Sequence, residues 1–265
     1  MLPVVVRRSL VRTTSSHNWA VRPLAVLLAV CCCLSAAGGQ WLETTIRFGY
    51  GSSPRALCYN TRDNKVYCVL SDSDQVAVID GATNLVLATA STGDRPQGLC
   101  YNPADDKVYC ANAGSDNVTV IDGASDEVIA TVAAGDGPQT LCHNSVDNKV
   151  YVGNMASYDV TVIDGATNAV VATVAAVTAR FMCYNPHDNK VYCTDGKLSF
   201  SALKVIDGKQ DSVLACIDSM IWPGPLCYNP QANKVYCGDY YGCNVMVIDG
   251  TTDDVIAIDS AGVFS

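Results

Sequence analysis

One sequence unit occurs five times in this chain of 265 residues, and this repetition constrains the fold more than any other feature. The first element of the unit reads LCYNTRDNKVYC, LCYNPADDKVYC, LCHNSVDNKVYV, MCYNPHDNKVYC and LCYNPQANKVYC at 57–68, 99–110, 141–152, 182–193 and 226–237. A Val-Ile-Asp-Gly element follows each copy, and its aspartates recur every 42 or 43 residues, at Asp80, Asp122, Asp164, Asp207 and Asp249. A period of about 20–50 residues indicates a solenoid, a propeller or another array of like units.

Each unit predicts four short strands. They are the stretch ending in Cys-Tyr-Asn, the Lys-Val-Tyr-Cys stretch, the run into Val-Ile-Asp, and a run such as EVIATV at 127–132. All four are rich in Val, Ile, Thr and Tyr and are bounded by Gly, Pro, Asn and Asp, which is typical of strands and turns. The strands are apolar on both faces, so each small sheet must be covered on both sides. We therefore predict an all-β fold, a β-propeller of five four-stranded blades of about 42 residues each.

The domain boundaries follow from the repeats. Residues 40–265 form one propeller domain, with repeats at about 55–96, 97–138, 139–180, 181–223 and 224–265. Upstream of them, ETTIRFGYGSSP (43–54) aligns with EVIATVAAGDGP (127–138) and predicts one extra N-terminal strand. The last repeat already has its own fourth strand, DVIAID (254–259), so one strand is left over. We expect a closed ring of five blades, with an open array as the alternative.

The unit also resembles a known repeat family. The string KVYCANAGSDNVTVIDGASDEVIATVAAGDGP (107–138) is similar to the YVTN-type β-propeller repeat, and the resemblance extends over roughly 43–259. It implies a secreted or surface-layer-like propeller, and such propellers in this family include ones with seven blades. This chain departs from the family in having five copies and in placing Cys where the family has Val. Related propellers are similar to lactonases and antibiotic-cleaving lyases, so the resemblance also implies an enzymatic alternative.

The N-terminus predicts export. Residues 1–22 contain four arginines and no acidic residue, and an apolar run of eleven residues, Leu24–Leu34, precedes the small residues 35–39. That run is shorter than the roughly 20 residues of a membrane-spanning helix, so we interpret 1–39 as a signal peptide. The protein is then periplasmic, extracellular or on the cell surface, with no stable membrane span after signal removal.

The charge balance restricts the partners. The net charge is −9, and removal of residues 1–39 leaves 13 basic against 26 acidic residues. Nucleic-acid binding needs clustered Lys and Arg to neutralise phosphates, and no such block exists in the sequence. We therefore expect no nucleic-acid partner, and a preference for neutral or cationic partners.

Cysteines recur at fixed positions in the repeats. Four pairs lie ten residues apart on the first and second strands of one hairpin: Cys58/Cys68, Cys100/Cys110, Cys183/Cys193 and Cys227/Cys237. In an exported protein such pairs suggest disulfides. The register of the hairpin decides, because a four-residue turn would place Cys58 opposite Tyr67 and direct the two cysteines to opposite faces. Two interpretations remain open: a disulfide in each hairpin, or cysteine used as a small buried hydrophobe.

Other chemistry-bearing residues have structural explanations. The Val-Ile-Asp-Gly aspartates are interpreted as turn residues rather than as calcium ligands. His143 replaces a strand tyrosine and His187 lies in a turn, and neither has a nucleophile at a suggestive spacing. We predict no catalytic residues, no metal site and no cofactor.

Two connections vary between the copies: the one from the fourth strand to the next repeat, and the one from the second to the third strand. In repeats four and five they carry large side chains, namely Phe200, Met220, Trp222, Tyr240 and Tyr241. Exposed aromatic residues on one rim are binding-site candidates. We therefore predict a non-catalytic scaffold that binds a protein or a glycan at this face. A propeller enzyme of lactonase or lyase type and a structural surface-coat protein are the alternatives.

Overall fold

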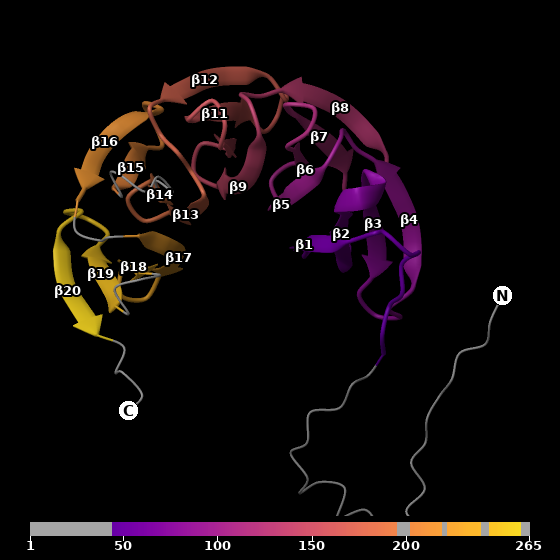
Figure 1. Cartoon of the computed structure of the whole chain (residues 1–265), viewed down its shortest axis with the longest axis horizontal. Coiled ribbons are helices and arrows are strands. Elements are labelled where there is room, and N and C mark those ends of the chain that lie inside the picture. Colours follow the sequence, from indigo (N-terminus) through magenta and orange to yellow (C-terminus); the bar gives the residue numbers. More distant parts are fainter. Residues whose placement is uncertain (1–43, 195–201, 219–221, 240–243, 261–265) are drawn as a thin grey trace, which may run out of the picture. The chain divides into compact units, whose positions relative to one another are not determined.

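The computed structural model describes residues 44–194, 202–218, 222–239 and 244–260. Twenty strands form five four-stranded antiparallel sheets, each in sequence order, here called blades one to five (Figure 1). Blade one comprises β1 (Pro54–Asn60), β2 (Lys65–Leu70), β3 (Gln75–Asp80) and β4 (Val86–Ser91), with a short 3-10 turn at Ser71–Ser73. Blade two comprises β5 (Pro96–Asn102), β6 (Lys107–Asn112), β7 (Asn117–Asp122) and β8 (Val128–Ala133). Blade three comprises β9 (Pro138–Asn144), β10 (Lys149–Asn154), β11 (Asp159–Asp164) and β12 (Val170–Ala175). Blade four comprises β13 (Phe181–Asn185), β14 (Lys190–Thr194), β15 (Leu203–Asp207) and β16 (Ser212–Ile217). Blade five comprises β17 (Pro223–Asn229), β18 (Lys234–Asp239), β19 (Asn244–Asp249) and β20 (Val255–Ser260).

The predicted fold class is therefore confirmed, with five blades of four strands. The predicted signal peptide, 1–39, lies outside the described residues. No helix in the described part of the chain is long and apolar enough to cross a membrane.

Two kinds of turn close each blade on the same side, here called the turn side. In the hairpin of β1 and β2, the side chain of Asn60 accepts hydrogen bonds from the amides of Arg62 and Asp63, and Asn64 takes a left-handed conformation at φ 54°. Between β3 and β4, the carboxylate of Asp80 accepts hydrogen bonds from the amides of Ala82 and Thr83. Asn and Asp suit these places because their short side chains bond the local backbone and tolerate positive φ.

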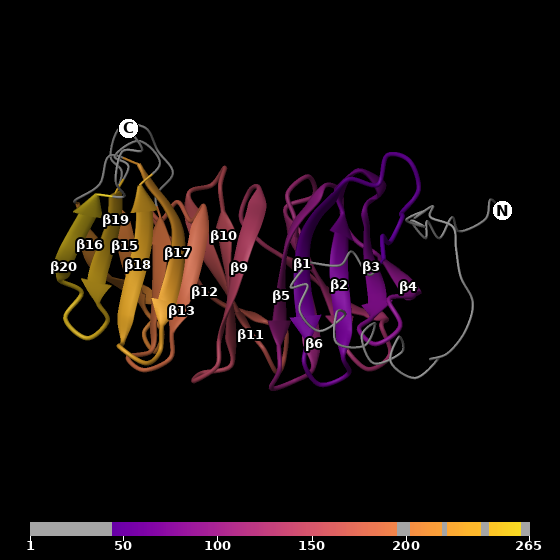
Figure 2. The same ribbon diagram turned by 90° about the horizontal axis from the view of Figure 1, so that it is seen from below.

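Successive blades pack face to face in sequence order. Their first strands, β1, β5, β9, β13 and β17, are neighbours, and the fourth strands lie at the opposite edge of each sheet (Figures 1 and 2). We call the face toward the following blade the trailing face and the face toward the preceding blade the leading face. Blades two, three and four each lie between two others, so both of their faces are buried and apolar, as the sequence pattern predicted.

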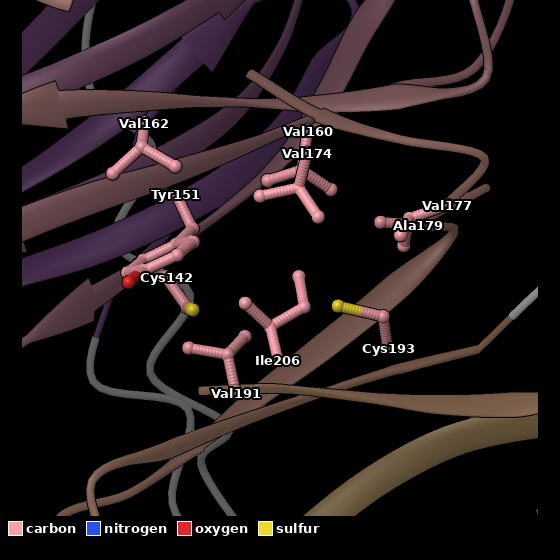
Figure 3. Close-up of a cluster of buried hydrophobic side chains, with 10 residues drawn as sticks. All are labelled: Cys142, Tyr151, Val160, Val162, Val174, Val177, Ala179, Val191, Cys193 and Ile206. Atoms are coloured by element: carbon pink, nitrogen blue, oxygen red, sulfur yellow. The ribbon is translucent and has the colours of Figure 1, made fainter. Parts of the chain in front are cut away.

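The interface of blades three and four shows the core (Figure 3). From the trailing face of blade three, Tyr151, Val160 and Val162 are fully buried. They meet Val191 and Ile206 on the leading face of blade four, which are also fully buried. The same positions form the other three interfaces, so one packing solution is used four times.

The extra N-terminal strand is not formed. Residues 44–49 belong to no strand, because the third strand of a preceding blade, with which they would pair, is absent among the described residues. Two of their side chains still pack as the alignment predicts. Ile46 and Phe48 cover Leu70 and Ala77 on the leading face of blade one, which are 3% and 0% exposed. We call 46–49 the N-terminal cap.

The expected closed ring is also not formed. Among the described strands, those of blade five make no extensive contact with those of blade one. On the trailing face of blade five, Val245 is 36% exposed, whereas its counterparts Val76, Val118 and Val160 are fully buried. The structure therefore corresponds to the open alternative, with one uncovered face at its C-terminal end.

The hairpin register decides the role of the cysteines. Cys58 pairs with Tyr67, and Leu57 pairs with Cys68, because the turn between β1 and β2 has four residues. The predicted pairs Cys58/Cys68, Cys100/Cys110, Cys183/Cys193 and Cys227/Cys237 therefore point to opposite faces of their sheets. All eight are free thiols, so the disulfide interpretation is wrong. The buried-hydrophobe interpretation holds for the four buried ones, Cys68, Cys110, Cys193 and Cys237. Burial raises the pKa of Cys100 and Cys183 to about 12.

Candidate functional site

The candidate site is the side of the blades opposite the turn side, here called the loop face. It carries the connections from second to third strands and from each blade to the next, because both leave the antiparallel sheets at the same end. Of the predicted binding residues, Phe200, Met220, Tyr240 and Tyr241 lie outside the described residues. Trp222 is described: it immediately precedes β17 and is half-buried.

Two aromatic residues on the loop face were missed by the sequence reasoning. Tyr158 lies in the connection between β10 and β11, has a left-handed φ of 59°, and is 44% exposed. Tyr50 follows the N-terminal cap and is fully exposed. Both lie in the variable connections that singled out Trp222, so the same comparison of copies, extended to repeats one and three, would have found them.

Buried polar side chains hold the loops in place. In blade three, Asn154 is fully buried, and its side-chain nitrogen donates to Asp159 Oδ1 at 2.7 Å and to Thr161 Oγ1 at 2.8 Å. The Thr161 hydroxyl in turn accepts a hydrogen bond from the Gly135 amide at 3.2 Å, which joins blade three to the connection from blade two. Buried polar groups of this kind rigidify a structure because an unpaired group is costly.

Aspartates link the loops of blades one and two to the blade that follows each of them. Asp74 Oδ1 accepts a hydrogen bond from the Arg95 amide at 2.8 Å, and Asp116 Oδ1 accepts one from the Gly137 amide at 2.9 Å. Several other aspartates on this face are exposed, namely Asp72, Asp94 and Asp136. The loop face of blades one to three is thus a rigid, acidic surface that bears single exposed aromatic residues.

The two histidines of the described blades have structural surroundings. His143 faces Asn148 at 3.5 Å, and burial lowers its pKa. His187 lies at the turn side, 3.2 Å from Asp188. In the described ranges, no group of three His, Cys, Asp or Glu side chains is arranged to hold a metal ion. The histidines are thus not brought together with a nucleophile or with the loop face.

The Val-Ile-Asp-Gly aspartates form turns, as interpreted from the sequence. Hydrogen bonds from Thr83 lower the pKa of Asp80, and hydrogen bonds from Thr167 lower that of Asp164. Each carboxylate bonds its own turn, for example Asp164 Oδ1 with the Thr167 amide at 2.8 Å. These carboxylates therefore stabilise turns on the side away from the loop face.

Comparison with known proteins supports the fold alone. No family model matches the chain, and no curated relative matches it. A solved structure of Kuenenia stuttgartiensis hydrazine synthase is similar, with a TM-score of 0.66 at 16% sequence identity. The match covers 80% of this chain and 66% of that chain, so this chain spans less than two thirds of the other protein. At this identity the likeness extends to the arrangement of the blades and not to activity.

Proposed function

We propose that this protein is an exported, non-catalytic β-propeller scaffold of the YVTN-repeat type that binds a protein or a glycan on its loop face. The observation that carries the proposal is the contrast between the two sides of the blades. Turns on one side repeat the same hydrogen bonds, whereas the loops on the other side are held rigidly and differ in their exposed side chains. Loops on a rigid scaffold are where binding residues concentrate.

The composition of the loop face indicates the class of partner. Tyr158 and Trp222 supply large contact areas at low entropic cost, and aromatic rings stack on the apolar faces of sugars as well as on protein side chains. The exposed carboxylates nearby disfavour anionic partners. A neutral glycan or a neutral to cationic protein surface is the partner that fits.

The test is binding by the purified chain to an array of neutral and charged glycans and to a panel of basic and acidic proteins. We expect binding to neutral or cationic members that Tyr158→Ala and Trp222→Ala both weaken. Leu87→Ala, at an exposed position on the outer strand β4, is the matched control and should leave binding unchanged. Weaker binding by the aromatic variants at an unchanged melting temperature supports the proposal. Unaltered binding by both variants contradicts it.

A lactonase or lyase activity is the second candidate, and it rests on the resemblance to propeller enzymes. It needs histidines and carboxylates gathered at one place, and the described histidines are separate. A surface-coat role is the third candidate. Hydrolysis of a lactone panel by the purified chain would favour the enzyme, and regular two-dimensional assembly would favour the coat.

A further inference from the structure

A repeated set of hydrogen bonds locks each blade to the next on the turn side. On the second strand of blade one, Lys65 Nζ donates to the carbonyl of Gly123 at 2.8 Å and to Asp126 at 2.9 Å. The hydroxyl of Tyr67 donates to the same carboxylate at 2.7 Å. We call this the Lys-Tyr latch: the donors lie on one blade and the acceptors on the Gly-containing turn of the following blade.

The latch recurs at all four interfaces between the described blades, with Asn168 in place of the aspartate between blades two and three. Its tyrosines are Tyr67, Tyr109, Tyr151 and Tyr192, and all four are fully buried. Their hydroxyls reach the carbonyls of Gly123, Gly165, Gly208 and Gly250 at 3.1–3.3 Å. Four equivalent contacts in one chain define what the trailing face of any blade accepts: the Gly-containing turn and the apolar leading face of another blade of this repeat.

Blade five carries the donors of a fifth latch without acceptors. Lys234 and Tyr236 occupy the positions of Lys65 and Tyr67, and neither side chain has a hydrogen-bond partner within the described part of the chain. Tyr236 is half-buried rather than buried, and Val245 beside it is 36% exposed. Cys227 on the same face is exposed, whereas its counterparts are half-buried or, in the case of Cys142, buried. Among the described residues, blade five thus presents the donor side of a blade interface with no blade packed against it.

Blade one carries a Gly-containing turn that corresponds to the acceptor turns of the other blades. Gly81 is exposed, whereas the corresponding glycines of blades two to five are buried, and no described lysine or tyrosine donates to its carbonyl. On the first strand, Leu57 and Tyr59 are 67% and 50% exposed on the leading face. Within the described ranges, the N-terminal cap covers the middle strands of that face and leaves its first strand uncovered. The cap makes no strand hydrogen bonds, so its displacement would break none of the ladder of blade one.

We infer that the trailing face of blade five binds the leading face of blade one of a second copy of this chain, with Lys234 and Tyr236 donating to the turn at Gly81. The Lys and Tyr donors of one copy and the Gly81 turn of the other occupy the same repeat positions as the partners in the four internal interfaces. Such a contact is heterologous, because different surfaces of the two copies meet, and it generates rings or open chains of copies. It goes beyond the proposed binding function and leaves the loop face free.

The first measurement is sedimentation velocity of the purified chain across a range of concentrations. We expect self-association that Tyr236→Phe weakens about tenfold in Kd, since one buried hydrogen bond to the turn is lost. Val245→Asp and Leu57→Asp each destroy one of the two surfaces and should give monomers. Both positions are exposed in the single chain, so both variants should fold. Val171→Asp, at a 51% exposed valine on the outer strand β12, is the matched control and should associate normally.

Mixing the two monomeric variants tests the direction of the contact. Val245→Asp retains the leading face of blade one, and Leu57→Asp retains the trailing face of blade five. An equimolar mixture should therefore form heterodimers and nothing larger. Association of either variant with itself would show a symmetric interface and overturn the inference.

Alkylation of Cys227 separates the remaining outcomes, with the exposed Cys216 as an internal reference. We expect Cys227 to be labelled in dilute protein and protected in concentrated protein. A monomer at all concentrations with Cys227 always labelled would overturn the inference. A monomer with Cys227 always protected would show that the chain closes on its own first blade, and would overturn it equally.

Discussion

Replacing Tyr151 by Phe should destabilise the protein, and the equivalent change at Tyr236 should not. Tyr151 is fully buried between blades three and four; its hydroxyl donates to Asp211 Oδ1 at 2.5 Å and lies 3.1 Å from the carbonyl oxygen of Gly208. Tyr236 occupies the same position in blade five, where no following blade lies within the described residues. The two substitutions remove the same atom from the same motif, so their difference isolates the contribution of the blade interface.

The magnitude follows from the acceptor. A hydrogen bond to a charged group contributes about 1.5–3 kcal/mol, and a buried acceptor left without its donor costs its desolvation energy. Lys149 still bonds Asp211 Oδ2 at 2.8 Å after the change, which keeps the carboxylate paired. We therefore expect a loss of about 2 kcal/mol for Tyr151→Phe, which lowers the melting temperature by about 4–8 °C in a chain of this size. For Tyr236→Phe in dilute protein we expect a change within about 0.5 kcal/mol.

Thermal and urea unfolding, followed by circular dichroism on both variants and on the unaltered chain, measures these values. Equal losses for the two variants would show that the phenol acts within its own blade. A change below about 0.5 kcal/mol for Tyr151→Phe, the size typical of surface substitutions, would refute the latch as a source of stability.

Three further predictions concern packing, acidity and thiol reactivity. Gly153→Ala should cost about 1–3 kcal/mol in urea unfolding, because an added Cβ would lie 2.5 Å from the carbonyl of Ala179, whereas Gly238→Ala, with nothing closer than 3.9 Å, should be nearly neutral. Melting temperature should fall at acid pH: the turn bonds lower the pKa of Asp80, Asp122, Asp164 and Asp249 from 3.8, so their stabilisation is present above that value and lost as pH falls through the lower folded values. Asp164→Asn should flatten that pH profile, and an unchanged profile would count against the turn bonds. In dilute protein at pH 8, iodoacetamide should label Cys216 and Cys227 first among the described thiols. Cys183 and Cys237 should react only on unfolding, since burial raises their pKa to about 12 and 11. Early labelling of Cys183, detected by mass spectrometry, would contradict this.

The fold could be predicted from the sequence because the repetition and the strand patterns are local signals. Each blade shows the same strand and turn residues, such as Asn60 and Asp80, at the same spacing, and a propeller is the arrangement that covers both faces of every sheet. Whether the two cysteines of a hairpin face each other depends on one residue more or fewer in the turn between the first and second strands. Asn64 takes the left-handed conformation that completes a four-residue turn, and the sequence permits that conformation without requiring it.

The latch could not be predicted from periodicity alone. Lys65 and Gly123 are 58 residues apart, and their contact depends on how one blade is placed against the next. The recurrence of Lys-x-Tyr in all five copies was visible, but a lysine in a strand is ordinarily solvated. Periodicity was equally insufficient to predict the structure at the ends of the array. The leftover strand was recognised from its alignment, whereas its pairing required a neighbour that the described residues do not supply.

The uniform direction of the latch also bears on how such a chain can change in length. Every interface joins donors on the second strand of one blade to acceptors on the turn of the next, so the blades are interchangeable modules with a fixed polarity. In-frame duplication of one repeat, from Pro96 to the residue before Pro138 for example, would insert a blade whose donors and acceptors both find partners. Deletion of one repeat would likewise rejoin matching surfaces. An array built in this way can gain or lose whole blades by recombination between repeats, at no loss of hydrogen bonding in the blades that remain.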